Sequence, residues 1–523
     1  MPYATGSWRF DRPAVAARTS ERLRALRLFL RRPRPDFGAE CFRGLRVRRV
    51  RGGASGCGRT AVRPTGYGTN DASFPPKGTY AGRPAPHAAV RDTETRSLLL
   101  YKPNKTLKVM KKHSFKAMLA AALLFGGFAF VACDDDDNPA PGTRPTIELK
   151  NMVAVKNYVQ SGTIDAVAPG ASTTFSFHAG KGQRLMFAAM YSYSNDLFVA
   201  PENPGIELFD DAGVPRTGVV ANALKLWDNG TRVNEAPGPG VVHPGVAQEG
   251  VVTEVNGTDS EGHTYPAASA LMQVSLEFDA VKSLFTCTIT NTSGNTSNET
   301  PFSGGVYVVS NVIDGDLVAK TPFFNRDQKS GVELTALAEN GDTAPLYQLV
   351  AGQTGIITTL QSAIVVVYTG DTNPIYQLGQ KDAQLGLSAL AQRGDPKPLR
   401  ESLSKVPQAR HIYIMDHTAQ PGESLQCTYE AAENEKVAFA AMFGYSNDWF
   451  FANGVALDAL TKGDVTSKTV LLDDGTAVNQ YPGAGNAQFM FNGTVMSEDK
   501  PIEVVGDEFP VPAVADLIKV TIR

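Results

Sequence analysis

Five cysteines in 523 residues are too few for a disulfide-dense scaffold, and the absence of a Cys-x-x-Cys pair excludes a zinc finger or a thioredoxin-type site. The sequence also contains no His-Glu-x-x-His, Gly-x-Ser-x-Gly, Walker A or Gly-x-Gly-x-x-Gly motif. The sequence therefore contains none of these common signatures of catalysis. We therefore expect that the protein is not an enzyme, and an enzyme built from paired carboxylates is the alternative.

The sequence has almost no net charge, since 50 Lys and Arg face 53 Asp and Glu, but the charge is unevenly spread. Residues 1–109 carry 19 Arg and 4 Lys against 7 acids, a net charge of +16, so the remainder carries 27 bases against 46 acids, or −19. A basic arm for nucleic acid or acidic surfaces is one interpretation of residues 1–109. We favour the other, a translated upstream extension that is not part of the natural protein.

Residues 110–132 have the pattern of a secretory signal peptide. Three lysines near Met110 precede residues 117–132, which are 16 residues without a charge, and Cys133 follows with four Asp after it. A membrane-spanning helix needs about 20 apolar residues, so the run is short for a span. The segment Phe130-Val131-Ala132-Cys133 resembles a bacterial lipobox with Phe130 in place of the usual Leu. This resemblance implies lipidation of Cys133 and a mature chain of 391 residues.

The expected mature chain would be attached to a membrane through acyl chains on Cys133, with residues 133–146 as a tether. The four Asp after Cys133 resemble the acidic tag that sends lipoproteins to the outer surface in some Gram-negative bacteria. We therefore expect a lipid-anchored protein of the cell envelope, in the outer membrane and exposed at the surface. Its 24 Lys and Arg against 46 acids give a net charge of −22, which argues against a nucleic-acid partner.

Two pairs of segments repeat within residues 147–523. The loop segment Ser194-Asn195-Asp196 recurs as Ser446-Asn447-Asp448, and in both copies a Pro-Gly-x-Ser lies upstream, with 27 positions from its Pro to the Asp. An Asp-x-Gly-Thr turn follows each loop, at Asp228 and at Asp473. The second pair is helical: residues 330–342 match residues 383–395, and Gly341 and Gly394 sit where a helix C-cap favours Gly. Ser330 and Glu333 have the spacing of a capping box.

Short alternating segments between Gly, Asn, Asp and Pro turns predict strands, for example at 173–177, 271–278, 285–289, 411–415 and 518–522. This pattern is typical of antiparallel β-sandwiches. We therefore expect a mainly β protein with two antiparallel β-sandwich domains, each with a short helix, at residues 147–355 and 356–523. Because the order of the motifs differs between the copies, the first domain can be a circular permutation of the second.

Together these motifs resemble the spondin N-terminal domain in its bacterial form. The family pattern combines a helix ending in Leu-Ala-Glu-x-Gly-Asp with a Ser-x-Asp-x-Phe loop and a Trp/Tyr-Asp-x-Gly-Thr turn. Residues 337–342 match the helix end fully, and residues 390–395 match it with Gln392 in place of Glu. The resemblance covers most of residues 147–523 as two copies. It implies a β-sandwich that serves in extracellular adhesion, that is, binding rather than catalysis.

The loop and turn carboxylates are the candidate metal ligands. Oxygen ligands on loops at one end of a sandwich suit calcium, which takes six to eight oxygens, and the candidates are Asp196, Asp228, Asp448 and Asp473. The alternative is that each Asp caps a turn through its own backbone. The neighbouring rings, namely those of Phe198, Trp449 and Phe450, are candidate exposed ligand contacts, with core packing as the alternative.

The sequence thus predicts a spondin-like surface lipoprotein with a binding or adhesion role that depends on calcium. Its partners would be the membrane, through the lipid anchor, and an extracellular glycan or protein. The alternatives are a carbohydrate-active enzyme or accessory glycan-binding protein, and a structural component of the matrix or envelope.

Overall fold

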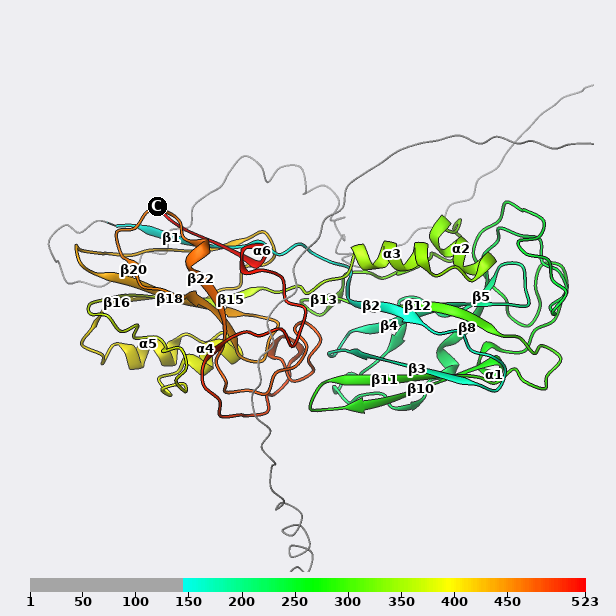
Figure 1. Ribbon diagram of the computed structural model, residues 1–523, viewed down its shortest axis with the longest axis horizontal. Helices are drawn as coiled ribbons and strands as arrows, with labels where there is room; N and C mark the ends of the chain where they lie inside the picture. Colours follow the sequence, from blue (N-terminus) through cyan, green and yellow to red (C-terminus); the bar gives the residue numbers. More distant parts are fainter. Residues whose placement is uncertain (1–143) are drawn as a thin grey trace, which may run out of the picture. The chain divides into compact units, whose positions relative to one another are not determined.

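The computed structural model describes residues 144–523. The predictions for residues 1–109, for the signal peptide at 110–132, for lipidation at Cys133 and for most of the tether lie outside the described residues. Within the described part, no helix is both long enough and apolar enough to cross a membrane. The structure is mainly β, with antiparallel sheets and few helices, which confirms the predicted fold class (Figure 1).

The larger strands form two pairs of sheets. In the first sheet pair, the larger sheet has the order β2 (Tyr158–Ile164), β12 (Phe302–Ser310), β4 (Arg184–Tyr191), β5 (Leu197–Pro201), β8 (Leu224–Asp228), β9 (Thr253–Glu254), and β6 (Ile206–Glu207) joins β4. The smaller sheet has the order β3 (Ser172–His178), β11 (Leu284–Asn291), β10 (Met272–Asp279), β7 (Gly218–Val219). The predicted strands at 173–177, 271–278 and 285–289 therefore all belong to this smaller sheet.

The second sheet pair repeats this arrangement. Its larger sheet has the order β16 (Ala409–Met415), β15 (Leu360–Tyr368), β18 (Lys436–Phe443), β19 (Trp449–Asn453), β22 (Thr469–Asp473), β23 (Glu503–Val504), and β20 (Leu457–Asp458) joins β18. Its smaller sheet has the order β17 (Ser424–Thr428), β1 (Thr146–Asn151), β24 (Ile518–Ile522), β21 (Gly463–Asp464). A separate short hairpin consists of β13 (Val312–Ile313) and β14 (Asp316–Leu317).

Strand β1 lies in the second sheet pair, although the sequence placed residue 147 with the first domain. It pairs with both β17 and β24, so that Leu149 faces Leu425 on one side and Val520 on the other. The pairing is favourable because Leu149 and its neighbour Ile147 become fully buried. The chain therefore starts the second sheet pair, builds the whole first sheet pair, and returns at β15.

The strand orders of the two sheet pairs are related by a circular permutation. Strand β1 occupies the place that β11 has in the first sheet pair, and β15 occupies the place of β12. Along the chain, the first sheet pair starts at β2 and ends with β11 and β12. The second sheet pair starts with β1 and β15, the equivalents of β11 and β12, and ends with β24, the equivalent of β10. This relation explains why the repeated motifs occur in different orders along the sequence.

Two helices, not one, cover the outer face of each larger sheet. Helices α2 (Val332–Asn340) and α3 (Ala344–Gly352) lie along the sheet that contains β2, β12 and β4, and the corresponding helices are α4 (Leu387–Arg393) and α5 (Lys397–Leu403) (Figure 1). The single-turn helices α1 (Ala268–Leu271) and α6 (Val514–Leu517) precede β10 and β24. Gly341 and Gly394 are left-handed C-caps as predicted, and a second helix then begins with a Pro in its first turn.

The capping box expected at the start of α2 is wrong. Gly331 is the N-cap, and no side chain caps the helix there. The helix is held by packing instead, because Leu334 and Leu337 are buried against the sheet. On the facing strand β4, Met186 contacts this helix layer, whereas its neighbour Phe187 belongs to the core between the two sheets.

Both larger sheets are therefore buried on both faces. Cys287 of β11 is a buried thiol, and burial raises its pKa to about 12. Cys427 of β17 is half-buried.

Candidate functional site

Each Ser-x-Asp loop is shaped by its serine. The Ser194 hydroxyl donates to the carbonyl oxygen of Tyr191 at 2.7 Å and accepts from the backbone N–H of Leu197 at 3.0 Å. The Ser446 hydroxyl of the second copy makes the same two hydrogen bonds, with the same two distances. Because both hydroxyls are buried, they satisfy backbone groups that have no access to water. The loop therefore holds the next Asp in a fixed position.

The Asp of each loop ties the loop to the following turn. Oδ2 of Asp196 accepts from the backbone N–H groups of Thr231 and Arg232 at 2.8 and 2.9 Å. Oδ2 of Asp448 accepts from the equivalent groups of Thr476 and Ala477 at 2.7 and 2.8 Å. Each threonine hydroxyl also lies 3.0 to 3.1 Å from the same oxygen. These carboxyl groups are buried, so the contacts have a structural role in both copies.

Asp228 and Asp473 cap their own turns. Oδ1 of Asp228 accepts from the backbone N–H of Gly230 at 2.7 Å, and Oδ2 accepts from the side-chain amide of Asn234 at 2.7 Å. Asp473 has the same pair of partners two and six residues later, at 2.8 and 2.5 Å. Gly230 has a positive φ of 74°, and a Cβ there would lie 2.5 Å from the backbone of Val251. Only glycine fits this turn, which supports the interpretation of these Asp residues as turn caps.

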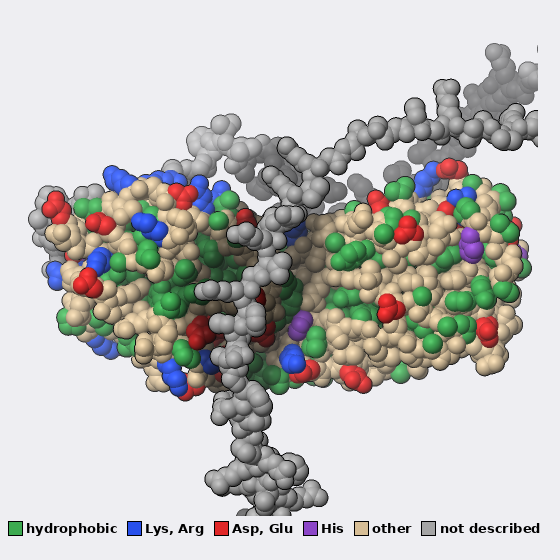
Figure 2. Space-filling model, in the orientation of Figure 1, with side chains coloured by type: hydrophobic (Ala, Val, Ile, Leu, Met, Phe, Trp, Pro, Cys, Tyr) green, Lys and Arg blue, Asp and Glu red, His purple; other side chains and the backbone are tan. Residues whose placement is uncertain are grey.

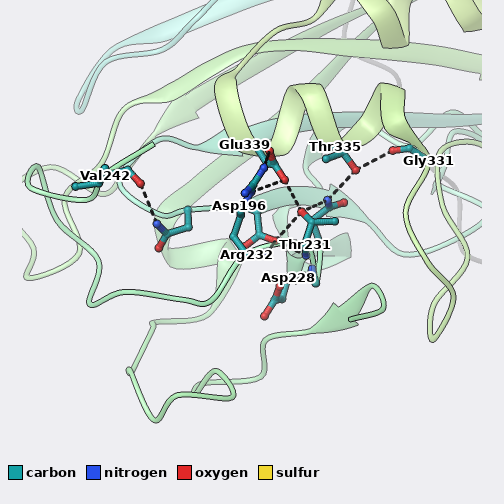
Figure 3. A network of polar contacts seen from close by, with 11 residues as sticks. Asp196, Asp228, Thr231, Arg232, Val242, Gly331, Thr335 and Glu339 are labelled. Carbon is teal, nitrogen blue, oxygen red and sulfur yellow. Dashed lines mark hydrogen bonds and ion pairs between the residues drawn. The ribbon is translucent and has the colours of Figure 1, made fainter. Parts of the chain in front are cut away.

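The helix layer contributes one further residue to each site. In the first copy, Oε1 of Glu339 accepts from the Thr231 hydroxyl at 2.8 Å, and Oε2 accepts from the Arg232 guanidinium at 2.8 Å (Figure 3). In the second copy, the Gln392 amide donates to the Thr476 hydroxyl at 2.9 Å. Glu339 and Gln392 were not among the predicted site residues, although both lie at the Glu position of the repeated helix-end motif.

The residue after each turn Asp differs between the copies. Asn229 donates from its side-chain amide to the Thr231 hydroxyl at 3.0 Å. In the second copy this position is Asp474, whose Oδ2 lies 3.0 Å from the Thr476 hydroxyl oxygen. The first copy therefore has a carboxyl group on the helix, Glu339, and an amide on the turn, Asn229. The second copy has an amide on the helix, Gln392, and a carboxyl group on the turn, Asp474.

Proton counting at Thr476 indicates that Asp474 is protonated. The hydroxyl oxygen accepts from Gln392 and has a single proton to donate, yet two carboxyl groups contact it. Two backbone N–H groups donate to the same oxygen of Asp448 and favour its ionised form, whereas Asp474 has no such bonds, so Asp448 accepts the hydroxyl proton. Asp474 must then donate, as Asn229 does in the first copy. In agreement, burial, followed by the charges of Asp382 and Asp448, raises the pKa of Asp474 to about 8.

The other buried carboxyls show the same tendency. Burial, followed by the charge of Asp228, raises the pKa of Asp196 to about 6. Burial, followed by the charge of Asp473, raises the pKa of Asp448 to about 7. The pKa of Asp228 is also raised, mainly by burial. The backbone hydrogen bonds lower each of these pKa values, but burial outweighs them.

Few oxygen atoms at the predicted calcium sites are free to bind an ion. Residues 144–523 contain no group of three or more His, Cys, Asp or Glu arranged to hold a metal ion. Both oxygens of Asp228 and Asp473 are used within the turns. One buried oxygen has no protein partner in each loop, namely Oδ1 of Asp196 and Oδ1 of Asp448. These two oxygens fit a role as ligands, and calcium binding stays a prediction.

No protein-family model matches this chain, and no curated protein matches its sequence. The resemblance to the spondin N-terminal domain therefore stays a prediction that rests on the motifs themselves.

The prediction of exposed ligand contacts at the three aromatic residues is wrong. Phe198 and Phe450 are fully buried, and Trp449 is 2% exposed. Phe198 and Phe450 lie on the sheet faces that the helices cover, because both larger sheets are buried on two sides. The Trp449 indole N–H donates to the side-chain oxygen of Asn479 at 2.7 Å. Core packing, the alternative interpretation, describes all three rings.

Proposed function

We propose that this chain is a spondin-like binding protein with an adhesion role, anchored through lipid on Cys133 at the surface of a Gram-negative outer membrane. The observation that carries the proposal is the duplicated hydrogen-bonded anchor at Asp196 and Asp448. Each anchor fixes the base of a long segment between two strands, residues 229–252 in the first copy and 474–502 in the second, and the first of these segments lies largely at the surface. Long segments held at the end of a rigid sandwich are a common place for binding surfaces.

The chemistry of the anchors supports binding over catalysis. Their carboxylates accept backbone and side-chain N–H groups, so every oxygen except Oδ1 of Asp196 and Oδ1 of Asp448 is engaged in holding the turns. Acid–base catalysis would instead need a carboxyl group that reaches a substrate. On the face shown in Figure 2, the acidic side chains are scattered among uncharged ones, so the visible surface has no dominant acidic patch. A surface of this kind suits recognition through mixed polar contacts.

Calcium dependence is part of the proposal. The unpartnered Oδ1 atoms of Asp196 and Asp448 would be the first ligands of a bound ion. At a free calcium concentration about a hundredfold above Kd, binding would stabilise the folded chain by about 2.7 kcal/mol. Chelation of calcium from the full chain should therefore lower the melting temperature by several degrees.

The matched control for this experiment is the double variant Asp196→Asn with Asp448→Asn. Asn keeps an acceptor oxygen for the backbone N–H groups but removes the charge, so this variant should melt at the same temperature with and without chelator. An unchanged melting temperature for the unmodified chain would contradict calcium binding. The anchor is tested separately by labelled palmitate, which should be incorporated by the natural chain and not by Cys133→Ala; incorporation by that variant would contradict lipidation at Cys133.

The binding role itself is tested with an array of glycans and matrix proteins probed with the full chain. Binding of the chain to at least one glycan or matrix protein supports the proposal. Binding to none of them contradicts it.

A further inference from the structure

A cleft of about 650 Å³ lies where the two sheet pairs meet. One wall consists of the edge strands β2 and β3 with Tyr307 of β12, and the other consists of segments that precede and follow β23. Volumes of 300–1,000 Å³ at the junction of two structural units are typical of small-ligand sites. The residues that line this cleft include Gln160, His178, Tyr307, Asn479, Tyr481 and Phe509.

The walls of this cleft are held together by buried hydrogen bonds. The Gln183 side-chain amide donates to the carbonyl oxygen of Gly483 at 2.8 Å, and the Gln480 amide donates to the carbonyl oxygen of Val281 at 3.1 Å. The Tyr445 hydroxyl donates to the carbonyl oxygen of Val312 at 3.0 Å. These contacts cross from one sheet pair to the other, so a ligand would meet a preformed cleft and lose less free energy to ordering it.

Aromatic rings line both walls. The His178 ring stacks on Tyr481 with a centroid distance of 5.1 Å, and the edge of Phe509 packs against both rings. Tyr307 stacks on Phe175 at 4.5 Å and is half-buried, with its ring over Gly162. Because these rings pack on one another, what they leave to the cleft is a fixed apolar border beside polar groups. An apolar border of this kind suits the C–H groups of a sugar.

The polar groups of the cleft are mainly uncharged. The Gln160 oxygen accepts from the His178 backbone N–H, and the Asn479 side chain already contacts Trp449 and Asp473. The remaining polar lining includes the hydroxyls of Ser161, Ser176 and Thr354. The charged side chains are Lys282 and Glu508, one of each sign. Burial lowers the pKa of His178, so its ring is neutral at pH 7. A charged ligand would meet no surplus of opposite charge, whereas a ligand rich in hydroxyl groups would find neutral donors and acceptors.

We propose that this cleft binds a short neutral oligosaccharide. The inference rests on the proposed binding function but not on calcium, because the cleft residues are not the Asp residues of the two anchors. The sugar would pack against the half-buried ring of Tyr307 and exchange hydrogen bonds with the polar groups around it.

The test uses the full chain and neutral oligosaccharides of two to four glucose, mannose, galactose, xylose or N-acetylglucosamine units. The strongest binder is then titrated against two variants, Tyr307→Ala, which removes the ring, and Ser176→Trp, which fills the cleft from an exposed position. Each should weaken binding by about tenfold or more, the equivalent of losing a stacking contact or the space for the sugar. The matched control is Tyr347→Ala, an exposed tyrosine on α3, and it should bind as the natural chain does.

Folding of each variant is checked by its melting temperature, and two cleft variants are used so that one unstable protein does not decide the result. Failure of all neutral oligosaccharides to bind would overturn the inference. It would also be overturned if both cleft variants bound the oligosaccharide as tightly as the natural chain does. Selective binding of acidic saccharides or of peptides would overturn it as well. If the array detects a ligand whose binding ignores both cleft variants, the proposed binding function stands and the cleft is not its site.

Discussion

Replacement of Asp474 by Asn should make the protein more stable at pH 8. Asp474 is fully buried and must keep a proton to donate to Thr476, because the single proton of that hydroxyl goes to Asp448. An Asn side chain donates without needing that proton. The first copy already uses this solution, since Asn229 donates to Thr231 at 3.0 Å.

The size of the effect follows from the pKa of Asp474. Burial, with the charges of Asp382 and Asp448, raises this pKa from 3.8 to about 8. In the unfolded chain the group ionises near pH 3.8, so its contribution to stability is fully present below that pH and is lost as the pH rises to about 8. At about 1.36 kcal/mol for each pH unit, the loss amounts to roughly 6 kcal/mol at most. Asp474→Asn should remove this loss of stability. The separate loss of stability that comes from the raised pKa of Asp448 should remain.

The assay is urea unfolding of both proteins at pH 5, 6.5 and 8. The unfolding midpoints should differ least at pH 5 and should diverge as the pH rises, with the variant more stable. The matched control is Asn229→Asp in the first copy, which places a carboxyl beside Glu339 and should create a new loss of stability with rising pH. The reasoning is refuted if Asp474→Asn is less stable than the natural chain at pH 8, or if its pH dependence is unchanged.

Three other substitutions test the anchors by thermal and urea unfolding. Ser446→Ala leaves buried backbone groups unsatisfied and should cost about 1–3 kcal/mol, so a loss below a few tenths would contradict the role of the hydroxyl. Gly230→Ala should cost more than about 2 kcal/mol because its Cβ meets backbone, whereas Gly257→Ala, with a similar φ and open space, should cost less. Glu339→Gln leaves the Arg232 guanidinium without its carboxylate and should cost about 1–2 kcal/mol; an unchanged midpoint would show that solvent replaces the ion pair.

Much of the local structure could be predicted because it depends on short-range rules. The alternating segments became strands, and Gly341 and Gly394 became left-handed C-caps, since only nearby residues decide these features. The loop and turn Asp residues were found as a repeated set for the same reason. Their turn-capping role was one of two options, and the sequence contains no information on which N–H groups fold back onto them.

The features that sequence reasoning missed depend on long-range pairing. Strand β1 pairs with β17 and β24, whose residues lie more than 270 positions away, and no local pattern selects these partners. Glu339 reaches the first turn because α2 packs on the sheet beside it, which the motif alone did not indicate. Phe450 was expected at the surface because its second sheet face was not known to carry a helix layer.

The central position of β1 also decides how the fold would carry a mechanical load. Thr146 and Arg523 exchange two backbone hydrogen bonds, so the first and last strands of the described part meet at their ends. If the chain is tethered through Cys133, a pull from the membrane enters at Thr146 and acts on a strand that is hydrogen-bonded along both edges. Extraction of that strand would break two ladders before the force reached the first sheet pair. The permuted order thus places a strand that is hydrogen-bonded along both edges next to the expected anchor.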